Sequence, residues 1–132
     1  MTIFVDTSAL YAVLDADDLN HDRAARQLDD LLARQEDLVC TNYILVETVS
    51  LLQRRLGLKA VGDLQNTMMR ALRTIWVDES THVAGANLLL VANRRQLSLV
   101  DCVSFSVMHR LEVTSAFTFD QHFAEQGFDC VP

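Results

Sequence analysis

The chain has 132 residues, half of them hydrophobic, which is enough for one domain to bury a core without disulfide or metal staples. Its 11 basic residues stand against 18 acidic ones, and this net charge of −7 gives no compositional sign of a nucleic-acid-binding protein. The three cysteines form no CxxC pair, which argues against a disulfide framework or a zinc knot and favours a reducing, cytoplasmic setting.

Strands and helices are predicted to alternate from the first residues onward. The apolar, β-rich run Thr2–Val5 predicts a buried strand, and Thr7–Leu14 predicts a helix. Beyond an acidic loop, alanines and leucines at helical spacing predict an amphipathic helix over His21–Gln35. A second short strand is predicted at Leu38–Cys40, and a helix follows over Tyr43–Leu56.

The second half of the chain continues the same alternation. The predicted elements are, in order, a helix over Leu58–Leu72, a strand over Thr74–Val77, a helix over Thr81–Arg94, a helix from Ser98 to about Leu111, a strand over Val113–Phe119 and an edge strand over Phe128–Val131. Such alternation is typical of an α/β three-layer sandwich, with a short, mostly parallel central sheet and helices on both faces. We expect a single domain over residues 1–132 that involves no membrane, because the longest apolar run is far too short to span one.

Two acids stand where predicted strands end. Asp6 directly follows the first strand, and Asp120 directly follows the strand that ends at Phe119. In parallel sheets the functional crevice lies beyond the carboxyl ends of the strands. Each aspartate is equally suited to capping the helix or turn that follows it, so neither indicates a site by itself.

Two further acids lie on predicted helices. Glu47 lies within the apolar helix YILVETVSLL, where a carboxylate needs a partner such as an arginine or a metal ion. Asp101 follows Ser98 with the spacing of a helix start, which gives it a capping role that is compatible with a site. Taken together, the four acids suggest a cluster whose mutual repulsion a hard divalent cation would relieve.

The segments that contain these acids resemble the PIN-domain ribonucleases of the VapC toxin type. FVDTSALYAVLD contains Asp6, TNYILVETVSLL contains Glu47, and LSLVDCVSFSVMHRLEVTSAFTFDQHF contains Asp101 and Asp120, so that the resemblance covers the whole chain. One departure is Val100, which stands where the family often has Thr or Ser before the third acid.

The resemblance implies a PIN-like fold and a Mg²⁺- or Mn²⁺-dependent endoribonuclease, the toxin of a VapBC-type toxin–antitoxin pair. Asp6 and Asp101 would bind the metal directly, and Glu47 and Asp120 would bind it directly or through water. The implied partners are the RNA substrate, a small antitoxin laid into a groove near the acids, and a second copy in a homodimer.

The sequence offers two pairs of basic side chains for substrate binding. Two arginine pairs that follow predicted helices are candidates for contacts with the RNA backbone, or else belong to a solvated face: Arg54, Arg55, Arg94 and Arg95. The histidines are assigned surface or structural roles: His21, His82, His109 and His122.

Other classes of protein fit the sequence less well. A haloacid-dehalogenase-like phosphatase would need a second acid two residues after Asp6, where Ser8 stands. A receiver-like signalling module would need a late lysine, whereas the only lysine is Lys59. A non-toxin PIN domain in RNA processing and a catalytically inactive binding module remain as alternatives.

Overall fold

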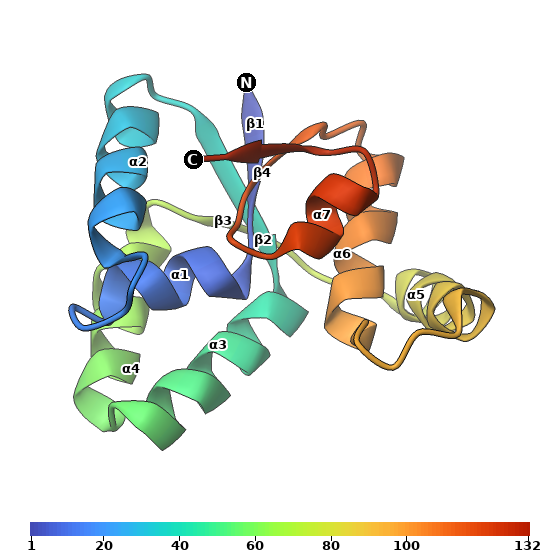
Figure 1. The fold of residues 1–132 in the computed structure, drawn as a ribbon, viewed down its shortest axis with the longest axis horizontal. Coiled ribbons are helices and arrows are strands. Elements are labelled where there is room, and N and C mark those ends of the chain that lie inside the picture. The colour runs from blue at the N-terminus through green and yellow to red at the C-terminus, as the bar shows by residue number, and fades with distance from the viewer.

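The computed structural model describes residues 1–132 and has one central sheet of five parallel strands. The strands lie in the order β3-β2-β1-β4-β5. Their bounds are β1 Thr2–Val5, β2 Asp37–Thr41, β3 Arg73–Ile75, β4 Ser115–Phe117 and β5 Asp129–Val131. Figure 1 shows the helices on both sides of this sheet. The predicted α/β sandwich is confirmed, and the sheet is parallel throughout.

Seven α-helices and one short 3₁₀ turn connect the strands. Their bounds are α1 Thr7–Leu14, α2 His21–Ala33, α3 Asn42–Arg55, α4 Leu58–Asn66, η1 Met68–Arg70, α5 Glu79–Ala92, α6 Leu99–Arg110 and α7 Gln121–Glu125. No helix combines the length and the apolar character that a membrane crossing requires.

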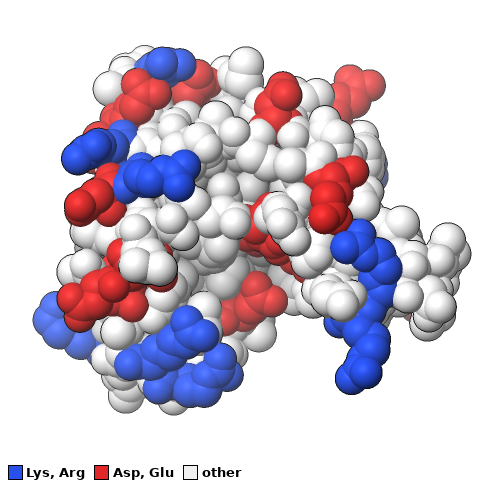
Figure 2. All heavy atoms as spheres, viewed as in Figure 1, with Lys and Arg blue, Asp and Glu red and all other residues white.

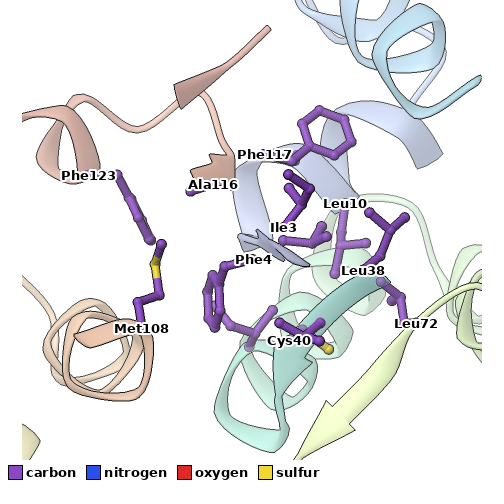
Figure 3. Close-up of a cluster of buried hydrophobic side chains, with 14 of the residues drawn as sticks. Ile3, Phe4, Leu10, Leu38, Cys40, Leu72, Met108, Ala116, Phe117 and Phe123 are labelled. Atoms are coloured by element: carbon purple, nitrogen blue, oxygen red, sulfur yellow. The ribbon is translucent and has the colours of Figure 1, made fainter. Parts of the chain in front are cut away.

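The central strand β1 explains why the chain begins with an unbroken apolar run. It pairs with β2 on one side and β4 on the other, with Ile3 opposite Leu38 and Ser115. Helices cover both faces of the sheet, so Phe4 and Val5 are both buried although they point to opposite faces. Figure 3 shows Phe4 within the cluster of buried side chains that fills the space between sheet and helices.

Two predicted elements are much shorter in the structure, and one helix was not predicted. The helix predicted over Leu58–Leu72 ends at Asn66 and continues as the 3₁₀ turn, because Asn66 and Thr67 have side chains that favour helix ends. The strand predicted over Val113–Phe119 is shortened to Ser115–Phe117. Helix α7 was not predicted, because five residues are too few to establish a helical period.

Helices α5 and α6 pack closely through a glycine. A Cβ on Gly85 of α5 would lie 2.5 Å from Cγ2 of Val103 and 3.1 Å from the Val103 backbone. Only a residue without a side chain permits this approach. Gly85 therefore fixes the position of α6, the helix that carries Asp101 in its first turn.

Candidate carboxylate site

The four predicted acids lie at the carboxyl end of the sheet or on helices that begin beside it. Asp6 caps α1 directly after β1, and Asp120 caps α7 shortly after the neighbouring strand β4. Glu47 lies in the second turn of α3, and Asp101 lies in the first turn of α6. Figure 2 shows acidic side chains in a hollow near the middle of the molecular face, between groups of basic side chains to the lower left and to the right.

Asp6 is held by hydrogen bonds to one of its two carboxylate oxygens. Its Oδ2 accepts from the Ser8 hydroxyl at 2.8 Å, from the Ser8 amide at 3.3 Å and from the Thr118 hydroxyl at 3.0 Å. No hydrogen bond from the protein reaches Oδ1, which is therefore left for another ligand. Burial raises the pKa of Asp6 to about 6, and the charges of Asp101 and Asp120 add to this increase against the lowering effect of the two hydroxyls.

The same two hydroxyls also connect Asp6 with the segment that carries Asp120. The Ser8 oxygen accepts the Phe119 amide at 2.9 Å, and the Thr118 oxygen accepts the Asp120 amide at 2.9 Å. The Thr118 amide still donates to the Val131 carbonyl of β5, and from Phe119 on these bonds take the place of strand pairing. The bonds thus fix Asp6, at the end of β1, relative to the segment that carries Asp120 after the adjacent strand β4.

Glu47 is a half-buried carboxylate on the apolar helix α3. Burial raises its pKa, the nearby Asp101 and Asp120 raise it further, and a hydrogen bond with the Thr7 side chain acts in the opposite direction. The salt bridge considered as an alternative is absent, because no arginine or lysine lies within 4.0 Å of any of the four acids. Glu47 therefore faces the other carboxylates without a basic partner.

Asp101 combines the predicted capping role with a place in the cluster. Its Oδ2 accepts the Ser98 amide at 3.1 Å, while its own amide donates to the Ser98 hydroxyl at 3.0 Å, which completes a capping box. Its remaining oxygen makes no such bond. Burial and the neighbouring Asp120 raise the pKa of Asp101, even though these hydrogen bonds oppose the increase.

His122 lies beside the acids, although the sequence indicated only a surface or structural role for it. Ligand atoms of Asp101, Asp120 and His122 all lie within 4.8 Å of one another, close enough to share one cation. The His122 Nδ1 lies 2.9 Å from Asp120 Oδ1, but at an angle unsuited to a hydrogen bond, so that this buried nitrogen has no partner. The only feature of the sequence that indicated a place for His122 near the site was its position two residues after Asp120, where the predicted strand has ended.

The donor set of this cluster fits a divalent cation. Buried carboxylates whose pKa is raised by neighbouring carboxylates and that lack an arginine or lysine partner are costly to keep ionised together, and a bound cation would remove that cost. Oxygen ligands are those that Mg²⁺ and Mn²⁺ prefer. Fold and site together define a parallel α/β domain with a carboxylate cluster at the carboxyl edge of its sheet.

Comparison with known proteins identifies the family. The PIN domain profile matches residues 3–129, and the chain belongs to the PIN domain family. It is similar to proteins named 23S rRNA-specific endonuclease VapC20 from two strains of Mycobacterium tuberculosis. The identity is 34% over 128 residues, which are 96% of this chain and 95% of the relative. The family predicted from the three segments is thus confirmed.

Solved structures show the same fold. The crystal structure of M. tuberculosis VapC20, described as a Sarcin-Ricin loop cleaving toxin, matches with a TM-score of 0.83 and 32% identity, over 96% of this chain and 95% of that one. VapBC2 from Rickettsia felis, bound to a promoter DNA fragment, matches with a TM-score of 0.73 and 12% identity, over 98% and 97% of the two chains. FitAcB from Neisseria gonorrhoeae matches with a TM-score of 0.71 and 14% identity, over 100% and 97%.

The predicted arginines lie at two places around the acids. Arg54 and Arg55 end α3, while Arg94 and Arg95 lie in the connection from α5 to α6, and all are exposed. Arg94 pairs with Glu125 at 2.9 Å, whereas neither Arg54 nor Arg95 has an acidic partner.

Proposed function

We propose that the protein is a metal-dependent endoribonuclease that hydrolyses RNA phosphodiester bonds, and that it is the toxin of a VapBC-type pair. The observation that carries this proposal is the grouping of Asp6, Glu47, Asp101 and Asp120 at the carboxyl edge of the sheet, with no arginine or lysine within 4.0 Å of any of them. The cluster lies in a chain that is 34% identical to VapC20 over nearly its full length. The name of that relative makes RNA the first substrate class to test.

Mg²⁺ or Mn²⁺ is the proposed cofactor. Asp6 and Asp101 would hold it through the oxygens that the protein leaves free, and Glu47 and Asp120 would complete the shell directly or through water. When bound, such a cation neutralises charge on the phosphate and lowers the pKa of the attacking water. Attack by water at phosphorus, with cleavage of the P–O3′ bond and transfer of a proton to the leaving O3′, would leave a 5′-phosphate and a 3′-hydroxyl.

The protein's own residues contribute orientation. Ser8 and Thr118 fix one oxygen of Asp6, and the capping box fixes one oxygen of Asp101, so both carboxylates present their second oxygen without rotating. Preorganised charges of this kind require little rearrangement during the reaction. The hydroxyls that connect Asp6 with the Asp120 amide hold the two strand ends in register.

RNA would reach the acids between the two arginine groups. Arg54 and Arg55 on one side, with Arg94 and Arg95 on the other, would supply the positive charge for backbone contacts that the acidic composition lacks overall. We propose an antitoxin partner because VapBC2, with a TM-score of 0.73, is a toxin–antitoxin relative in fold. A homodimer and a cytoplasmic location complete the proposal.

The test is cleavage of 23S rRNA and of a mixed RNA pool by purified protein, with Mg²⁺ or Mn²⁺ and with an EDTA control. Asp101→Asn removes one charge of the cluster, and Asp78→Asn is the matched control because Asp78 caps α5 outside the cluster. We expect discrete cuts by wild type and Asp78→Asn, none in EDTA, and none by Asp101→Asn. Equal cutting by Asp101→Asn would assign the activity to another site or to a contaminant.

The alternatives predict different results. A non-toxin PIN domain would cut RNA without arresting growth when produced in cells. An inactive binding module would cut nothing, and Asp101→Asn would retain its cellular effect.

A further inference from the structure

A groove opens beside the carboxylate cluster where three helices meet. It has a volume of about 420 Å³, within the range of small-ligand sites. Its wall is formed by α3, α5 and α6, which contribute Asn42, Tyr43, Val46, Glu47, His82, Leu99 and Val100. Figure 1 shows α3 and α6 approaching each other at this end of the sheet, with α5 beside α6.

Two rings stand at the groove in fixed orientation. Tyr43 of α3 and His82 of α5 meet edge to face, with centroids 5.8 Å apart and planes at 68°. The Tyr43 hydroxyl and the His82 Nδ1 are hydrogen-bonded, which holds the rings together across two helices. His82 is exposed and Tyr43 partly so, and therefore their surfaces are available to a flat ligand. Stacking on such rings is how proteins hold unpaired RNA bases.

The rest of the groove suits the edge and second face of a base. Val46 is 66% exposed, although an apolar side chain gains from being covered. Leu99 and Val100 add further apolar surface from α6. At one end, the carboxamide oxygen of Asn42 accepts the Val77 amide at 2.8 Å, which leaves its amino group free to donate to a base carbonyl.

The groove is continuous with the carboxylate cluster. Glu47 belongs to both, and Val100 directly precedes Asp101 in the first turn of α6. In a nucleotide the phosphate is joined to the base through the sugar. A base bound in the groove would therefore place its phosphate beside the acids. A peptide helix would instead need a row of pockets at helical spacing, whereas this groove is a single site beside the acids.

From this arrangement we infer that the groove binds one unpaired nucleobase of the RNA, stacked on one of the Tyr43 and His82 rings and in edge contact with the other, next to the phosphodiester that is cut. The inference rests on the proposed ribonuclease function and assigns its substrate contacts. The residues that select the cleavage position would then lie on α3 and α5 and not among the carboxylates. His82, which the sequence suggested was merely a surface or structural residue, becomes a substrate-binding residue.

The test measures binding separately from cleavage. Asp101→Asn protein is mixed in Ca²⁺ with 23S rRNA fragments that carry 4-thiouridine, irradiated and digested, and the crosslinked peptides are identified by mass spectrometry. We expect crosslinks at Tyr43 or His82. In the same background, Tyr43→Ala and His82→Ala should each raise the Kd for these fragments by about tenfold, the effect of losing one stacked base.

Two variants serve as controls. Tyr43→Phe keeps the ring and should retain the Kd within about twofold, and Leu90→Ala changes an exposed apolar side chain outside the groove. Melting curves show whether each variant is folded, and His82→Ala, on the surface, gives the answer if Tyr43→Ala does not fold. Crosslinks confined to other segments, with an unchanged Kd for His82→Ala, would overturn the inference. If Tyr43→Ala and His82→Ala weakened the binding of a protein partner and left the Kd for RNA unchanged, the inference would equally be overturned. A wild-type protein that binds these fragments but cuts no RNA would count against the ribonuclease function and leave the base-binding result standing.

Discussion

Replacing Asp6 with asparagine should stabilise the metal-free protein. Asp6 is 4% exposed, and burial raises its pKa from 3.8 to about 6. Because each pKa unit corresponds to 1.36 kcal/mol, keeping Asp6 ionised in the folded state costs about 3 kcal/mol. Asparagine retains an acceptor for the Ser8 and Thr118 hydroxyls and caps α1 equally well.

The pH dependence follows from the direction of that shift. Between about pH 4 and 6 the folded protein holds a proton on Asp6 that the unfolded chain has released, so that stability falls as the pH rises through this window. The cost is absent below the unfolded pKa and complete above about pH 7. Wild type and Asp6→Asn should therefore differ most at pH 8 and converge near pH 4.

Thermal and urea unfolding in EDTA at pH 8 and pH 5 measure this difference. The expected gain of about 3 kcal/mol corresponds to an increase in Tm of roughly 10 °C for a domain of this size. Asp78→Asn is the matched control, since hydrogen bonds with Thr81 lower the pKa of Asp78, and its replacement should bring no gain. An Asp6→Asn protein that is less stable than wild type at pH 8, with the same pH profile, would refute the reasoning.

Three further predictions follow from particular contacts. Thr118→Val removes a hydroxyl that lowers the pKa of Asp6, so that pKa should rise further in an NMR titration and RNA cleavage should fall about tenfold or more; an unchanged titration would contradict this. Gly85→Ala should destabilise the protein by about 1–3 kcal/mol in urea, because the new methyl group overlaps Val103, and Gly85→Ala with Val103→Ala should recover part of the loss. Arg95→Ala should weaken RNA binding and reduce the salt slope of log K by about 1, whereas an unchanged slope would place Arg95 outside the interface.

Much of the fold could be predicted because short local sequence patterns are enough to define most of its strands and helices. The apolar run at Thr2–Val5 requires burial on both faces, and only the centre of a covered parallel sheet provides it. Elements whose ends depend on other segments were less predictable. Beyond Thr118 the segment leaves the sheet, because the Phe119 amide donates to the hydroxyl of Ser8, more than a hundred residues away, and not to a strand.

In the candidate site, too, some residues could be predicted from the sequence and others could not. Glu47 could be predicted because its helix is apolar and offers it no partner, and Asp6 because it follows a buried strand. The proximity of His122 to Asp101 could not be predicted, since it depends on helix α7, which is too short to leave a period in the sequence. Tyr43 and His82 lie 39 positions apart in the sequence on two different helices, and nothing in the residues around either one predicts that they pair.

The most direct measurement compares metal binding and RNA cleavage in one titration. Mn²⁺ is added to wild type, Asp6→Asn and Asp101→Asn, and both the increase in Tm and the single-turnover rate of RNA cleavage are recorded at each concentration. The carboxylate cluster predicts one Mn²⁺ midpoint for both signals in wild type, and neither signal in the two variants. Cleavage that persists in either variant or in EDTA, or stabilisation by Mn²⁺ without any cleavage across the RNA pool, would contradict a metal-dependent ribonuclease at this site.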